Sequence, residues 1–215
     1  MVKAVIFDLD GTLLNSIEDI ANCVNHTLNE FGFTGHETER YKNFIGNGAF
    51  NLIKRSLPKN FNNDEMVKKI LGKYNDYYRL HYMDYTKPYD GICDMLGELQ
   101  KKRIKMAIVS NKPDEFTKKI VSELLCDFNF NIVVGQREGI PHKPDPTAVL
   151  ECLAVMNVHS MDCLYVGDSG VDMKTAINSN IFAIGVTWGF RSRDELKENG
   201  ADVIIDYPAE IYKYL

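Results

Sequence analysis

Short apolar runs that end in polar or glycine-containing turns recur along the chain. Because these runs do not alternate with polar residues, each of them predicts a strand buried on both faces. The six runs are 4–7, 104–109, 132–134, 163–166, 181–186 and 203–205. Amphipathic stretches with helical spacing lie between the later runs, at 113–125, 146–156, 171–178 and 194–199. This alternation predicts an α/β fold with an open parallel sheet flanked by helices.

The segment from residue 16 to residue 85 follows the first predicted strand and contains no strand-like run. Apolar residues recur in it at three- and four-residue steps, as at Ile20, Val24 and Leu28, which predicts helices. Open α/β sheets bind ligands at the carboxyl edge, so an insertion there is expected to cap the site. We therefore expect a Rossmann-like core domain of residues 1–15 and 86–215, with a helical cap domain of residues 16–85 inserted after the first strand.

Charge and composition exclude several classes of partner. The chain has 25 Lys and Arg against 30 Asp and Glu, a net charge of −5, and shows no basic patch for nucleic acid or an anionic membrane. The first apolar run leads straight into Asp8 and Asp10, so we expect no signal peptide, and no run approaches the ~20 residues of a membrane span. Five cysteines without a C-x-x-C pair predict buried thiols in a reducing compartment. We expect a cytoplasmic monomer or homodimer.

Polar side chains follow four of the predicted strands. They are Asp8 and Asp10, Ser110 and Asn111, Lys143, and Asp168 with Asp172. Because the carboxyl ends of parallel strands meet at one edge of a sheet, these residues are expected to surround one crevice. So many carboxylates repel one another unless a divalent cation joins them, and oxygen ligands beside a phosphate site suit Mg²⁺. The lysine and the Ser-Asn turn suit a phosphoryl group.

Each residue also has a plainer interpretation. The Asp8–Thr12 run is typical of a turn that ends a strand, and most lysines, Lys143 included, are solvated. Asp172 is placed either to bind a metal, to orient Lys143, or to cap the following helix.

Four motifs, in order and in context, resemble those of the haloacid dehalogenase-like superfamily. They are Asp8-Leu9-Asp10-Gly11-Thr12, Ser110-Asn111, Lys143-Pro144, and Gly167-Asp168 with Asp172. The helical insertion resembles the first type of cap in that superfamily. Residues 8–28, 45–49 and 185–190 look most like phosphoglycolate phosphatases. Asn15 departs from that family, which usually has Asp there, but it lies outside the four motifs.

The resemblance implies a Mg²⁺-dependent phosphatase that acts on a small phosphorylated acid, foremost 2-phosphoglycolate, through an aspartyl phosphate. Asp8 would be the nucleophile. Asp10 would be the acid and then the base, and would bind the metal through its backbone carbonyl. Asp168 would hold Mg²⁺ directly, and Asp172 would hold it through water.

The remaining motif residues would contact the substrate. Ser110, Asn111 and Lys143 would hold the phosphate oxygens as charge redistributes. Thr12 is included with them, although support of the turn is its more frequent role. In the insertion, the run Gly46-Asn47-Gly48 precedes an amphipathic helix whose N–H groups could bind a substrate carboxylate.

Other functions stay open at this stage. A pyrophosphatase, a sugar phosphatase and a β-phosphoglucomutase-like enzyme would share the motif set and differ in the cap. A dehalogenase is disfavoured because those relatives lack the second aspartate of the first motif, here Asp10. The non-enzymatic alternative is a phospho-accepting signalling module, but such modules are shorter, lack a helical insertion and accept phosphate after a later strand.

Overall fold

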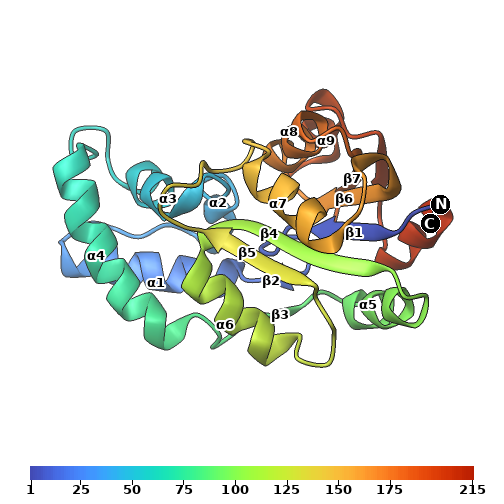
Figure 1. Cartoon of the computed structure of the whole chain (residues 1–215). Coiled ribbons are helices and arrows are strands. Elements are labelled where there is room, and N and C mark those ends of the chain that lie inside the picture. The colour runs from blue at the N-terminus through green and yellow to red at the C-terminus, as the bar shows by residue number, and fades with distance from the viewer. The chain divides into compact units, whose positions relative to one another are not determined.

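A computed structural model describes all residues from 1 to 215 (Figure 1). The chain forms two compact units. The first comprises Met1–Leu14 and Pro88–Leu215, and the second comprises Asn15–Lys87. Two short strands, β2 (Leu14–Asn15) and β3 (Lys87–Pro88), pair where the chain passes from one unit to the other and back.

The first unit is built on one six-stranded sheet with the order β5-β4-β1-β6-β7-β8, in which every pair is parallel. Its strands are β1 (Ala4–Phe7), β4 (Lys105–Pro113), β5 (Ile132–Gln136), β6 (Cys163–Gly167), β7 (Phe182–Val186) and β8 (Val203–Ile205). The residues of β1, near the centre of the sheet, have no exposed surface because both faces are covered. The predicted open parallel sheet is confirmed.

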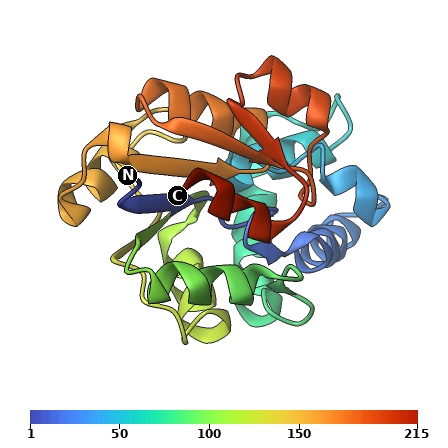
Figure 2. The ribbon, with the colours of Figure 1, turned by 90° about the vertical axis from the view of Figure 1, so that its right-hand side faces the viewer.

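Helices cover both faces of this sheet (Figure 2). One face packs against α7 (Thr147–Met156), α8 (Gly170–Asn178) and α9 (Arg193–Glu198), which share an apolar core with the strands. The other face is covered by α5 (Ile92–Lys101), α6 (Asp114–Leu124) and the C-terminal 3₁₀ helix Pro208–Tyr214. A further 3₁₀ turn, Ser160–Asp162, leads into β6. The α/β class expected from the sequence is therefore confirmed on both faces.

The second unit is helical, and only its two end residues belong to strands. Its helices are α1 (Ile17–Glu30), α2 (Thr38–Tyr41), α3 (Gly48–Ser56) and α4 (Asp64–His81). α1 packs against α2 and α4, and α3 packs against α4. The predicted apolar stripe of α1 is buried at Ile20, Val24 and Leu28, so the helical periodicity of this segment is confirmed.

One buried carboxylate ties the two ends of the second unit together. Asp19, in the first turn of α1, is 2% exposed. Its carboxylate accepts hydrogen bonds from the backbone N–H of Tyr85 (3.0 Å) and from both the backbone N–H (2.8 Å) and the hydroxyl (2.5 Å) of Thr86. Because these donors lie just before β3, Asp19 fixes the segment that leads back to the first unit.

Replacement of Asp19 by alanine is expected to lower the free energy of unfolding by about 3 kcal/mol, because the buried N–H and hydroxyl of Thr86 and the partly buried N–H of Tyr85 lose their acceptor. Urea unfolding measures this change. Asp76→Ala is the control, since Asp76 is exposed on α4 and its ion pair with Arg79 is long, 3.8 Å. Equal midpoints for the two variants would contradict the role given to Asp19.

The five cysteines differ in their exposure. Cys23, Cys152 and Cys163 are buried as predicted, but Cys93 and Cys126 are exposed, so the prediction of five buried thiols is wrong. Cys93 lies in the first turn of α5, and Cys126 follows α6. None of the helices combines the length and the apolar character needed to cross a membrane.

Candidate active site

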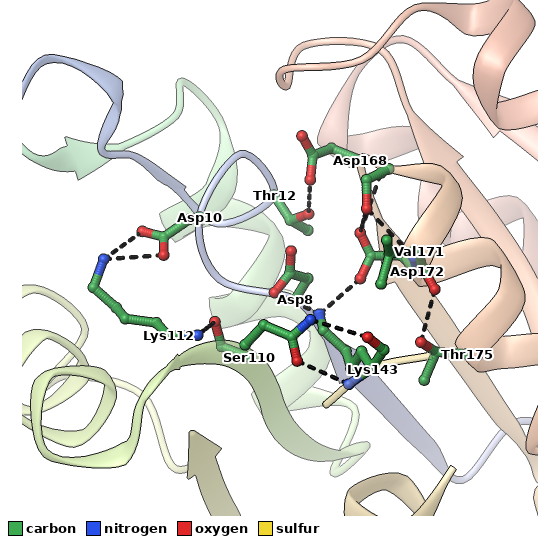
Figure 3. A network of polar contacts seen from close by, with 12 residues as sticks. Asp8, Asp10, Thr12, Ser110, Lys112, Lys143, Asp168, Val171, Asp172 and Thr175 are labelled. Carbon is green, nitrogen blue, oxygen red and sulfur yellow. Dashed lines mark hydrogen bonds and ion pairs between the residues drawn. The ribbon is translucent and has the colours of Figure 1, made fainter. Parts of the chain in front are cut away.

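The site begins where the chain leaves β1 through a tight turn. Gly11 in this turn has a φ of +89°, a backbone conformation that favours glycine. A Cβ atom at Gly11 would lie 2.3 Å from Oδ2 of Asp168, so the glycine also permits close approach to the end of β6. The side chains of Asp8 and Asp10 leave this turn toward different partners (Figure 3).

Lys143 joins two of the predicted carboxylates. It lies in the loop between β5 and α7, and its Nζ is 2.8 Å from Oδ1 of Asp8 and 2.7 Å from Oδ1 of Asp172. The Lys143 side chain is 4% exposed and that of Asp172 is fully buried. A lysine is rarely buried unless it is paired, so the alternative of a solvated loop lysine is excluded.

The backbone of Lys143 is held by a residue of the second motif. The Asn111 side chain accepts a hydrogen bond from the Lys143 N–H (2.8 Å) and donates one to the Lys143 carbonyl oxygen (3.1 Å). Ser110, one residue earlier in β4, accepts a hydrogen bond from the backbone N–H of Lys112 (3.2 Å). The second motif thus orients Lys143, and substrate contact by Ser110 and Asn111 stays a prediction.

Asp172 uses both of its oxygens within the protein. Oδ1 accepts hydrogen bonds from Lys143 and from the hydroxyl of Tyr165 (3.2 Å). Oδ2 accepts from the hydroxyl (2.5 Å) and the backbone N–H (3.1 Å) of Ser169, which forms a capping box at the start of α8. Two of the roles weighed from the sequence, orientation of Lys143 and capping of the helix, are therefore both observed.

Asp168 is fixed by the turn after β1 and by the loop after β7. Its Oδ1 accepts a hydrogen bond from the Thr12 hydroxyl (3.4 Å), and its Oδ2 accepts one from the Phe190 N–H (2.7 Å). Thr12 has no exposed surface, and its carbonyl oxygen accepts a hydrogen bond from the Trp188 side chain (2.9 Å). The structure thus gives Thr12 a supporting role, and its contact with substrate stays a prediction.

A small substitution at Gly189 should disturb Asp168. A Cβ atom there would lie 2.3 Å from the Cβ of Asp168 and 2.3 Å from the carbonyl oxygen of Gly11, and neither atom can move freely. Gly189→Ala is therefore expected to lower kcat/KM about 10²-fold through displacement of the carboxylate. Gly97→Ala, in α5 with its nearest neighbour 3.9 Å away, is the control and should keep full activity. Equal activity of the two variants would contradict this account of Asp168.

Burial and repulsion both oppose negative charge in this cluster. Burial, followed by repulsion from Asp172, raises the pKa of Asp8 to about 7, although Lys143 acts in the opposite sense. The same two causes raise the pKa of Asp168 well above its usual range. Burial opposes the charge of Lys143 as well, but Asp172 and Asp8 together raise its pKa. The three carboxyl groups outnumber the single ammonium group, so full ionisation of the cluster would leave an excess of buried negative charge.

The same three carboxylates are suited to a metal ion. One oxygen from each of Asp8, Asp168 and Asp172 lies within 4.8 Å of the others. Carboxylate oxygens are the ligands of hard divalent cations, and such a cation would neutralise the excess charge. The donor set therefore fits a divalent cation. Each oxygen of Asp172 already accepts two hydrogen bonds, whereas each oxygen of Asp168 accepts one, so Asp8 and Asp168 are better placed as direct ligands.

The Asp10 carboxylate lies outside this cluster (Figure 3). Nζ of Lys112 lies 2.9 Å from Oδ1 and 3.0 Å from Oδ2 of Asp10. Lys112 and Tyr165 were not expected among the site residues. Only their positions in the sequence could have indicated them. Lys112 comes two residues after Ser110, and Tyr165 is a polar side chain in a buried strand.

Known proteins match both the sequence and the structure. The sequence profile of the haloacid dehalogenase-like hydrolases matches residues 5–186, most of the chain. The chain belongs to this family. The four motifs that suggested the resemblance contribute the side chains described above.

Two phosphoglycolate phosphatases are similar to this haloacid dehalogenase-like hydrolase over nearly its whole length. The enzyme from Aquifex aeolicus is 30% identical over 218 residues, covering 100% of this chain and 97% of the relative. The enzyme from Pseudomonas putida is 29% identical over 208 residues, covering 95% of this chain and 76% of the relative. A crystal structure from Lactobacillus delbrueckii subsp. bulgaricus has a TM-score of 0.93 and 33% identity, covering 99% of this chain and 97% of that one.

Proposed function

We propose that the chain is a Mg²⁺-dependent phosphomonoesterase that hydrolyses 2-phosphoglycolate to glycolate and phosphate. That it is a phosphatase follows from its family and from relatives similar over nearly its whole length. The observation that carries the mechanism is the buried ion-pair chain Asp8–Lys143–Asp172 beside Asp168, at the carboxyl edge of the sheet.

Asp8 and Asp168 are the proposed ligands of Mg²⁺, with the backbone carbonyl of Asp10 and, through water, Asp172. Bound Mg²⁺ would neutralise the carboxylates and the phosphate oxygens. The burial and repulsion that raise the pKa values of Asp8 and Asp168 support this assignment, because a cation favours the ionised form that a nucleophile needs. Mg²⁺ is preferred over softer metals because only oxygen ligands are offered.

In the proposed reaction, an oxygen of Asp8 attacks phosphorus as the bond from phosphorus to the leaving oxygen breaks. Asp10 gives its proton to that leaving oxygen. In the second half, Asp10 takes a proton from water as the water oxygen attacks phosphorus and the Asp8 carboxylate leaves. Lys143 forms an ion pair with Asp8 and would also bind a phosphate oxygen. This contact would hold the phosphoryl group next to Asp8 and favour in-line transfer.

The choice of 2-phosphoglycolate rests on the names of the relatives and on one feature of the second unit. α3 begins at Gly48, and Gly46 and Gly48 both have positive φ angles, 115° and 79°. Arg55 fixes this turn through hydrogen bonds to the Asn47 side chain (2.6 Å) and the Phe44 carbonyl oxygen (2.9 Å). We predict that the backbone N–H groups at the start of α3 bind the substrate carboxylate. The variant Gly48→Val tests this prediction and should raise KM for 2-phosphoglycolate.

Steady-state kinetics with a substrate panel test the proposal. Phosphate release from 2-phosphoglycolate with Mg²⁺ is compared with release from pyrophosphate, glucose 6-phosphate and a nucleotide. The assays are repeated after the metal has been removed and after Mg²⁺ has been added back. We expect the highest kcat/KM for 2-phosphoglycolate and no release without a divalent cation. A clear preference for another substrate would retain the mechanism and overturn the substrate assignment. No release from any substrate would favour a mutase or a phospho-accepting module.

A further inference from the structure

A second buried ion pair lies beside the carboxylate cluster. The Lys112 ammonium contacts both oxygens of Asp10, at 2.9 and 3.0 Å, and the two side chains are 6% and 11% exposed. The pair joins the turn after β1 to the end of β4. The Asp10 carboxylate is not part of the Asp8–Asp168–Asp172 group.

The backbone of Lys112 is fixed on both sides. Its N–H donates to the hydroxyl of Ser110 (3.2 Å), and its carbonyl oxygen accepts a hydrogen bond from the hydroxyl of Thr117 in α6 (3.2 Å). Pro113 follows directly and α6 begins at Asp114. The Lys112 side chain therefore extends from a backbone that is held in place. A residue that positions another side chain requires such a fixed backbone.

The two aspartates of the first motif are held by different lysines. Asp8 points to Lys143, and Asp10 points to Lys112, on opposite sides of the turn (Figure 3). Without Lys112, the Asp10 carboxylate would have the buried Lys143 and any bound cation as competing partners. Rotation toward them would remove Asp10 from proton transfer.

We propose that Lys112 is a positioning residue that keeps the Asp10 carboxyl group apart from the metal-binding carboxylates and available for proton transfer to the leaving group. This inference rests on the proposed function. A contact through two oxygens suits the role, because one oxygen can stay on Lys112 while the other carries the proton. Lys112 itself forms no bond to the substrate in this account.

The dependence of kcat on the leaving group distinguishes this positioning role from a purely structural role of Lys112. 2-Phosphoglycolate releases an alkoxide, which must be protonated, whereas 4-nitrophenyl phosphate releases a stabilised anion that needs little help from an acid. Lys112→Met is expected to lower kcat for 2-phosphoglycolate about 10²-fold with little change in KM, and to lower kcat for 4-nitrophenyl phosphate less than about fivefold. Lys112→Arg should restore part of the loss.

Controls separate this inference from its alternatives. Lys119→Met removes an exposed lysine of α6 that pairs only with Glu115 four residues away, and should leave both rates unchanged. The double variant Lys112→Met with Asp10→Asn should be no slower than Asp10→Asn alone, because the two residues act as one unit. If Lys112→Met does not fold, as judged by circular dichroism, Lys112→Gln and Lys112→Arg are assayed in its place.

Two outcomes would overturn the inference. An equal loss of kcat with both substrates would show that Lys112 only maintains the structure. A raised KM for 2-phosphoglycolate with an unchanged kcat would instead make Lys112 a ligand of the substrate carboxylate. Failure of the proposed function is distinguishable from both, since the wild-type protein would then release phosphate from neither substrate. If only the substrate assignment fails, the best alkyl phosphate of the panel replaces 2-phosphoglycolate.

Discussion

Asp8→Asn is expected to lower kcat for 2-phosphoglycolate at least about 10⁴-fold while the protein stays folded. An amide at this position cannot attack phosphorus. The variant should not lose stability in the absence of metal, because burial and repulsion from Asp172 disfavour the charge that the substitution removes. Lys143 keeps its ion pair with Asp172, 2.7 Å away. Phosphate release and thermal unfolding together measure the two effects.

Asp127→Asn is the matched control for this variant. Asp127 is exposed in the segment after α6, so the same chemical change there should leave both activity and stability as they are. If Asp8→Asn kept more than about a hundredth of the wild-type kcat, Asp8 could not be the nucleophile.

Removal of the Lys143 side chain is expected to affect activity and stability together. Lys143→Ala leaves the buried carboxylates of Asp8 and Asp172 without their shared cation, which should lower the free energy of unfolding by about 3 kcal/mol. It should also lower kcat/KM about 10²–10³-fold, since a charge that stabilises both bound phosphate and the transition state is lost. Urea unfolding and steady-state kinetics give the two numbers.

Lys143→Arg and Lys119→Ala complete this experiment. Arginine keeps the charge and should recover much of the stability, whereas its larger head group should leave activity low. Lys119 forms an exposed pair with Glu115, so its removal should cost less than about 1 kcal/mol. Wild-type kinetics in Lys143→Ala would place Lys143 outside the reaction.

The strands could be predicted from the sequence because this sheet is covered on both faces. Uninterrupted apolar runs such as 4–7 and 163–166 coincide with β1 and with all but the last residue of β6, since every side chain of these inner strands is shielded. α5 was not expected. Ile92, Met95 and Leu99 form its buried stripe, but Gly97 lies in its middle and lowers its intrinsic helix propensity. Packing on the sheet outweighs that cost.

The candidate site residues could be predicted to the extent that they follow parallel strands. Asp8 and Asp168 come directly after β1 and β6, and topology alone brings these strand ends together. Their partners could not be predicted. The Lys112–Asp10 pair joins residues 102 positions apart. Lys112 lies where the register between β4 and β5 shifts, between Val109 and Pro113, and no sequence pattern indicates that shift. The amide clamp of Asn111 on the Lys143 backbone is equally non-local.

The most direct test of the proposed mechanism is a rapid-quench experiment with Asp10→Asn, Mg²⁺ and 4-nitrophenyl phosphate. This substrate needs little acid catalysis, so the first half of the reaction should proceed, whereas the second half should stall without the Asp10 base. We expect a burst of one nitrophenolate per protein molecule and a phosphoryl group on Asp8 in the acid-quenched peptide. Steady release without a burst, and with no phosphoryl group on Asp8, would contradict it.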